Sequence, residues 1–136
     1  MNRKKFAAWI LLLFLIVSLA GCGSREEDTM NTVSYQQITA EEAKSMMEEQ
    51  PDAVVLDVRE QDKYDAEHIP GAVLLPVGTI NEETAASAIP EKDTMVLVYC
   101  RSGNRSKTAS QALAELGYTQ IYEFGGIKDW PYEVER

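Results

Sequence analysis

Short apolar runs alternate with amphipathic stretches over most of the chain, and this alternation restricts the fold more than any other feature. The strongest run, Thr94–Tyr99, is rich in β-branched residues and is typical of a strand buried on both faces of a sheet. A similar run spans Ala53–Val58, and shorter strand patterns occur at Tyr35–Ile38, Ala72–Leu75 and Gln120–Phe124. Strands that alternate with helices predict an α/β fold with a mainly parallel sheet.

Helix signals fill the intervals between the predicted strands. Thr39-Ala40-Glu41-Glu42 has the form of a capping box and predicts a helix that runs to about Glu49. A polar helical turn is expected at Glu60–Ala66, and a further helix at Asn81–Ala88. Ser106–Leu116 has small and apolar residues on one face, which predicts a helix, and Gly117 is its expected C-cap.

The first 21 residues have the form of a signal peptide. Arg3, Lys4 and Lys5 are followed by an uncharged, mostly apolar run at Phe6–Leu19. This run is shorter than the about 20 residues that span a bilayer as a helix, and its length suits a signal-peptide core. The next residues, Leu19-Ala20-Gly21-Cys22, resemble the lipobox of bacterial lipoproteins.

The resemblance to a lipobox implies cleavage before Cys22 and attachment of diacylglycerol to its sulfur. We therefore expect a cleaved signal peptide at 1–21, a lipidated flexible tether at 22–33 and one globular domain at 34–136. The domain would lie outside the cytoplasm, anchored to the bacterial cell membrane, and the sequence leaves open which membrane if there are two. An uncleaved membrane helix with an incidental cysteine is the alternative.

The charge of the chain excludes one class of partner. The sequence has 13 basic and 22 acidic side chains, and three of the basic ones lie in the predicted signal peptide. The remainder carries ten basic against 22 acidic side chains, a net charge of −12. Such an acidic body repels phosphates, so nucleic-acid binding is not expected, and any anion site must be formed locally.

Cys100 follows directly after the strongest predicted strand and precedes a predicted helix. In open α/β sheets ligands bind at the carboxyl ends of the strands, where backbone N–H groups and a helix N-terminus favour negative charge. Arg101 and Arg105 add positive charge, and Gly103 permits a tight loop. These features favour the Cys100 thiolate, which makes Cys100 the candidate nucleophile.

The loop of residues 101–105 suits an anion that contains sulfur. We expect the Cys100 thiolate to attack the outer sulfur of a small anionic donor such as thiosulfate, so that sulfite leaves and a persulfide remains on Cys100. A thiol or cyanide would then accept the sulfur. The expected binding residues are those of the loop: Arg101, Ser102, Gly103, Asn104 and Arg105.

Three segments together resemble the single-domain rhodaneses. Cys100-Arg101-Ser102-Gly103-Asn104-Arg105-Ser106 is similar to the active-site loop of that family. Leu56-Asp57-Val58-Arg59 with the segment His68–Ala72, and Tyr122–Ile127 with Trp130, resemble its N-terminal and C-terminal signatures. The resemblance covers about Val33–Arg136. It implies a five-stranded, mainly parallel sheet with helices on both faces, a sulfurtransferase activity carried by Cys100, and no metal or organic cofactor.

Several residues near the loop have more than one interpretation. Asp57, Arg59 and Ser106 are expected to support the loop without acting as acid or base. Arg105 either holds the loop through backbone carbonyls or binds substrate, since a guanidinium does both well. His68 is the only histidine, and its position in His-Ile-Pro-Gly favours hydrogen bonds to the backbone beside a turn over catalysis.

Two other functions stay open. The first is a cysteine phosphatase or arsenate reductase of the rhodanese fold. Four residues separate Cys100 from Arg105, whereas such phosphatases have one residue more, and the shorter loop favours sulfur over phosphate. The second is a non-catalytic module that binds a partner or senses redox state through an exposed thiolate.

Overall fold

The structure of the protein is a computed structural model, and it describes residues 34–136. The predicted signal peptide at 1–21, the predicted lipidation at Cys22 and the tether at 22–33 lie outside the described residues and stay predictions. Within the described part, no helix combines the length and the apolar character needed to cross a membrane.

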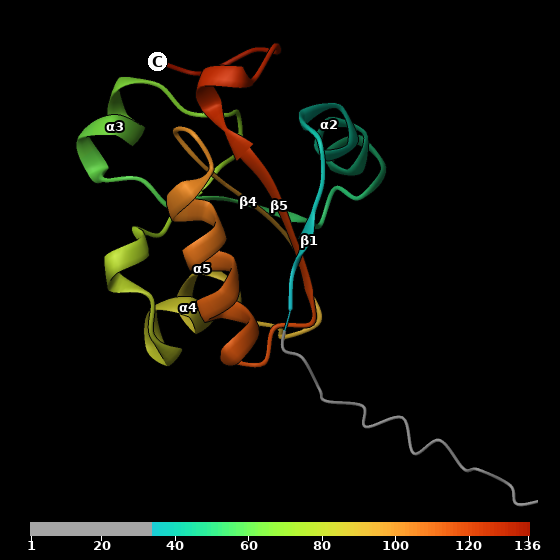
Figure 1. Cartoon of the computed structure of the whole chain (residues 1–136), viewed down its shortest axis with the longest axis vertical. Coiled ribbons are helices and arrows are strands. Elements are labelled where there is room, and N and C mark those ends of the chain that lie inside the picture. Colours follow the sequence, from blue (N-terminus) through green and yellow to red (C-terminus); the bar gives the residue numbers. More distant parts are fainter. Residues whose placement is uncertain (1–33) are drawn as a thin grey trace, which may run out of the picture. The chain divides into compact units, whose positions relative to one another are not determined.

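Five parallel strands form one sheet in the order β1-β5-β4-β2-β3, with helices between them in the sequence (Figure 1). This confirms the predicted α/β fold with a five-stranded sheet. The strands are β1 (Gln36–Gln37), β2 (Val54–Asp57), β3 (Val73–Leu74), β4 (Met95–Cys100) and β5 (Gln120–Gly126). The helices are α2 (Ala40–Glu49), α3 (Gln61–Ala66), α4 (Glu82–Ala88) and α5 (Asn104–Glu115), with 3-10 turns η1 (Val77–Thr79) and η2 (Ile127–Asp129).

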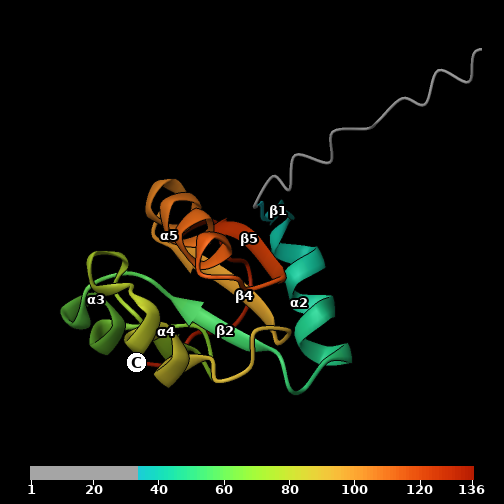
Figure 2. The same cartoon turned by 90° about the horizontal axis from the view of Figure 1, so that it is seen from below.

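Alternation along β4 separates the core into two layers, one on each face of the sheet. Val96, Val98 and Cys100 pack with α4 and α5, whereas Leu97 and Tyr99 pack with α2 and η2. Figure 2 shows α2 and α5 on opposite sides of the central strands. Successive side chains of a strand point to opposite faces, so Cys100 faces α5 and its neighbour Tyr99 faces away from it.

The caps of α2 and α5 explain where these helices begin and end. The capping box of α2 is present as predicted, since Thr39 and Glu42 exchange side-chain to backbone hydrogen bonds of 3.1 and 2.7 Å. Gly117, with φ of 94°, follows α5, and the N–H of Tyr118 donates to the carbonyl of Leu113 as in a Schellman motif.

The predicted start of α5 at Ser106 is wrong, because the helix begins at Asn104. The polar residues after Cys100 have the composition of a loop. Gly103, however, takes φ of 103°, a left-handed conformation that turns the chain sharply. The helix can therefore begin at the next residue, Asn104. Arg105 and Ser106 therefore lie in the first turn of α5, whose N-terminus is directed at the loop.

Candidate active site

The Cys100 thiol lies at the carboxyl end of β4, under the first turn of α5. Its residue is 1% exposed. The backbone N–H of Gly103 donates to Sγ at 3.0 Å, and Sγ lies 3.5 Å from the hydroxyl oxygen of Ser106. The loop thus brings a backbone donor, a hydroxyl group and a helix N-terminus together around one sulfur atom.

The surroundings of Cys100 favour its thiolate. Burial raises the pKa of the Cys100 thiol, but the Ser106 side chain and the backbone N–H groups of Ser106, Gly103 and Ser102 lower it by more. The net result is a pKa below the ordinary value of a cysteine. A depressed thiol pKa at a helix N-terminus is the usual condition for a reactive cysteine.

The end of β5 packs against the backbone of the loop and holds it in place. A Cβ placed on Gly126 would lie 1.9 Å from the carbonyl oxygen of Arg101 and 2.5 Å from the N of Ser102. Gly126 is the register partner of Cys100, and the N–H of Lys128 donates to the same Arg101 carbonyl at 3.3 Å. The two backbones therefore touch, and this contact leaves no room for a side chain at Gly126.

The remaining loop residues divide into buried and exposed positions. Gly103 and Ser106 are buried, Arg105 is half-buried, and Arg101, Ser102 and Asn104 are exposed. The structure therefore brings Gly103 and Ser106 onto the sulfur, while the side chains of the three exposed residues face solvent. Arg101 and Arg105 also line an outer pocket, together with residues that follow β2 and β5: Arg59, Glu60, Lys63, Ala66, Glu67, Ile127 and Lys128.

Arg105 makes an ion pair that the sequence does not predict. Its Nη1 donates to Glu60 Oε2 at 2.5 Å, which joins the first turn of α5 to the N-cap of α3. The guanidinium thus binds a carboxylate at the rim of the outer pocket. In this structure the guanidinium of Arg105 contacts Glu60 and not a loop carbonyl, although binding loop carbonyls is one of the two roles that the sequence leaves open for it.

Asp57 and Arg59 form a buried pair on the other side of the sheet from the thiol. Arg59 donates to Asp57 at 2.6 Å and to the Glu67 carbonyl at 2.7 Å. The Tyr99 hydroxyl donates to Asp57 at 2.7 Å, and burial raises the pKa of Tyr99, so this donor stays protonated. Since Asp57 is in register with Tyr99, it faces away from Cys100, and it supports the end of the sheet without contacting the sulfur.

His68 lies in a structural contact, as its position beside a turn predicts. Its ring stacks on Tyr64 with the centroids 4.0 Å apart, and its two nitrogens lie 2.9 Å from the Tyr64 carbonyl and 3.1 Å from the Glu135 carboxylate. Within residues 34–136, no group of three or more His, Cys, Asp and Glu side chains is placed to hold a metal ion.

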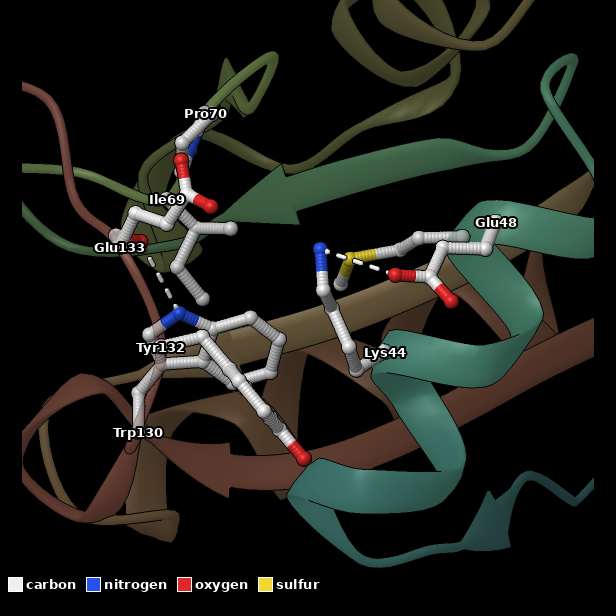
Figure 3. A pocket seen from close by; sticks show the side chains of 8 residues that line it. Lys44, Glu48, Ile69, Pro70, Trp130, Tyr132 and Glu133 are labelled. Carbon is white, nitrogen blue, oxygen red and sulfur yellow. Dashed lines mark hydrogen bonds and ion pairs between the residues drawn. The ribbon is translucent and has the colours of Figure 1, made fainter.

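A second pocket lies beside α2 and contains neither Cys100 nor a loop residue (Figure 3). Trp130 and Tyr132 line it together with Lys44 and Ile69. Trp130 is buried against Phe124, with ring centroids 5.6 Å apart, and its indole N–H donates to the Glu133 carbonyl. Trp130 thus belongs to the core, whereas Tyr132 is exposed, and both line this second pocket away from the loop.

Two residues at the site, Glu123 and Gly126, are not predicted to act there. Both lie within the C-terminal segment Tyr122–Ile127, which carries the resemblance but no role for either residue. The available signal for Glu123 is a carboxylate in an otherwise apolar strand. For Gly126 it is a second glycine that ends the same strand, a pattern typical of close backbone approach.

The fold and the site define an α/β domain with a cysteine-centred loop at the carboxyl edge of its sheet. Residues 39–132 match the profile of the rhodanese-like domain. The chain belongs to the rhodanese-like family.

Known relatives of the chain include sulfurtransferases. It is 40% identical over 74 residues to the thiosulfate sulfurtransferase PspE of Escherichia coli, which covers 54% of this chain and 70% of that protein. It is 36% identical over 97 residues to the thiosulfate sulfurtransferase GlpE of Coxiella burnetii, covering 71% and 87%. A solved structure of a rhodanese with anions from E. coli matches with a TM-score of 0.58 and 36% identity, covering 62% and 98%.

Proposed function

We propose that the protein is a sulfurtransferase that carries sulfur as a persulfide on Cys100. The observation that carries this proposal is the environment of Sγ, with a backbone N–H at 3.0 Å, a helix N-terminus above it and a thiol pKa below its ordinary value. The relatives named thiosulfate sulfurtransferase support the same chemistry. The proposed donor is thiosulfate or a similar small anion, and the proposed acceptor is cyanide or a thiol.

The reaction proceeds in two displacements at sulfur. The Cys100 thiolate attacks the outer sulfur of thiosulfate, a new S–S bond forms on Sγ, and the old S–S bond breaks with its electron pair leaving on sulfite. The persulfide then carries the single negative charge that the thiolate carried before. The acceptor attacks the outer sulfur, and the electron pair of the S–S bond returns to Sγ.

The loop stabilises both anionic forms of Cys100 by the same means. The Gly103 N–H and the N-terminus of α5 supply fixed dipoles, which need no rearrangement when charge develops. Arg101, Arg105 and Lys128 line the outer pocket and supply the local positive charge that the acidic body lacks. An anionic donor is therefore attracted to this end of the sheet.

An assay with thiosulfate and cyanide, run beside one with an aryl phosphate, tests the proposed function. We expect thiocyanate to be formed and no phosphate to be released. Phosphate release without thiocyanate would show that the chain is a phosphatase of this fold.

We expect Glu60→Gln to lower the KM for thiosulfate by about two- to fivefold, with kcat unchanged. The ion pair with Glu60 holds Arg105, so an incoming anion must compete with a carboxylate for the guanidinium. Steady-state kinetics at low ionic strength measure the effect, and added salt should reduce it.

Glu67→Gln is the matched control for this prediction. Glu67 lines the same pocket, but its carboxylate pairs with Arg136 and not with a loop arginine. If both variants lowered KM equally, the general loss of negative charge would explain the result, and release of Arg105 would not.

We also propose that the domain is held at the membrane outside the cytoplasm by a lipid on Cys22. The support is the basic start, the apolar run and the Leu-Ala-Gly-Cys sequence of the leader. We expect the wild type in the membrane fraction of bacterial cells and Cys22→Ala outside it after detergent-free lysis. Equal membrane retention of both chains would contradict anchoring through Cys22.

A further inference from the structure

The proposed reaction leaves one buried carboxylate at the site without a role. Glu123, in β5, is 3% exposed. Its Oε1 accepts the hydroxyl of Ser106 at 2.5 Å and the N–H of Gly125 at 2.8 Å. A buried carboxylate is costly unless it is hydrogen-bonded, and this one is bonded to the side chain that contacts the thiol.

Ser106 has one hydroxyl proton and several acceptors around it. Besides Glu123, the carbonyls of Gly103 and Gly125 lie 3.0 and 3.3 Å from its oxygen. The contact with the carboxylate is the shortest, and a hydrogen bond to an ionised acceptor is the strongest of these. The proton of Ser106 therefore points to Glu123, and the lone pairs of its oxygen are left to accept the S–H of Cys100 at 3.5 Å.

This arrangement limits how strongly Ser106 stabilises the Cys100 thiolate. While the Ser106 hydroxyl points to Glu123 it accepts from the thiol, and it lowers the pKa of Cys100 only when its proton turns to the sulfur. Ser106 Oγ lies between the two groups, 2.5 Å from the Glu123 carboxylate and 3.5 Å from Sγ. The negative charge of Glu123 is therefore near the sulfur, and a nearby like charge disfavours the ionised form of a thiol. Ser106 can stabilise the thiolate fully only when its proton turns from Glu123 to the sulfur.

We propose that Glu123 is a positioning residue which, through Ser106, restrains negative charge on Sγ and so favours the sulfur-loaded form of Cys100. The second half of this statement rests on the proposed function. In a persulfide the charge lies on the outer sulfur and no longer on Sγ, the atom that Ser106 contacts. Discharge returns the charge to Sγ, and a more basic leaving thiolate departs more slowly.

The other charged groups at this end of the sheet do not share the position of Glu123. These charged side chains line the outer pocket instead. They come from the segment after β2, from α3, from the loop, from α5 and from η2: Arg59, Glu60, Lys63, Glu67, Arg101, Arg105 and Lys128. Exchange of Glu123 for a neutral residue leaves all of them in place. A change in the pKa of the thiol on this exchange can therefore be assigned to Glu123 and not to the charged groups of the outer pocket.

Alkylation of Cys100 by iodoacetamide at a series of pH values tests the proposal. The chain used is full-length with Cys22→Ala, so that Cys100 is its only thiol. In this background Glu123→Gln keeps Oε1 as acceptor for Ser106 and Gly125 and removes the charge. We expect the midpoint of the alkylation profile to fall by about one pH unit. An unchanged or raised midpoint would overturn the proposal.

The same comparison in a Ser106→Ala background tests whether Ser106 transmits the effect. We expect a smaller shift there, because the hydroxyl that joins the two groups is absent. An equal shift in both backgrounds would overturn the part assigned to Ser106. Glu123→Ala, which removes charge and hydrogen bonds together, is a second variant with the same expected direction, and circular dichroism confirms that each variant folds.

Transfer from the loaded enzyme tests the effect on sulfur. Persulfide discharge to a thiol is expected to be faster in Glu123→Gln than in the chain with Cys22→Ala alone, and an equal or slower discharge would overturn it. Alkylation needs no sulfur donor. The pH profile of Cys100 alkylation therefore tests the role of Glu123 even if thiosulfate loads no sulfur onto the protein. Failure of the proposed function and failure of this inference are therefore distinguishable.

Discussion

After incubation with thiosulfate, the wild type is expected to gain the mass of one sulfur atom, and Cys100→Ser is expected to gain none. The sulfur-bearing atom in this proposal is Sγ of Cys100, which accepts the Gly103 N–H at 3.0 Å. A serine hydroxyl is a far weaker nucleophile at neutral pH and forms no persulfide. Intact-mass spectrometry of the folded protein measures the gain, and reduction should remove it.

Cys22→Ala is the matched control, because it removes the other cysteine of the chain and leaves the loop intact. It should gain one sulfur as the wild type does. A gain that survives in Cys100→Ser would assign the carrier to another residue. If the folded wild type gained no sulfur, Cys100 would not be open to small donors, and the proposed function would fall with it.

Asp57→Ala is expected to lower the free energy of unfolding by about 3–5 kcal/mol. Asp57 is fully buried, and its removal leaves the guanidinium of Arg59, 4% exposed, without its carboxylate partner. The Tyr99 hydroxyl loses its acceptor as well. Since a domain of this size is stable by about 5–15 kcal/mol, such a loss would unfold an appreciable fraction at 37 °C. Urea denaturation followed by fluorescence measures it.

Asp62→Ala is the control for this stability prediction. Asp62 also pairs with a basic side chain, Lys63, but both members are exposed to solvent. Its replacement should change the midpoint of unfolding little, because exposed ion pairs contribute little to stability. Similar losses for both variants would mean that the cost reflects a missing aspartate in general and not an uncompensated buried charge.

Most of the fold is predictable from local patterns. The apolar runs at Ala53–Val58 and Thr94–Tyr99 become the central strands β2 and β4, since a strand buried on both faces must be apolar throughout. The boundaries are less well predicted where tertiary contacts decide them. Edge strands β1 and β3 are only two residues long, shorter than the predicted ranges, and α5 starts earlier because of Gly103.

The candidate site is predictable only in its contiguous part. The loop from Cys100 to Ser106 is one stretch of sequence, so its chemistry can be read from neighbouring residues. Glu60 and Glu123 reach the loop because β2 and β5 flank β4 in the sheet, and local periodicity does not encode that order. Asp57 and Arg59 are predicted to support the loop, but their position on the face of the sheet away from Cys100 follows only from the register of Asp57 with Tyr99.

The contact between Gly126 and the carbonyl of Arg101 has a consequence for how this domain can be redesigned. The curvature of the loop is imposed by a neighbouring main chain, whereas the side chains of Arg101, Ser102 and Asn104 project outward. The residues at those three positions can be exchanged to suit a different sulfur donor, while the backbone N–H groups of the loop keep their orientation toward Sγ. Selectivity and reactivity are thus separately adjustable, and Gly126 is the position that must stay constant in any such library.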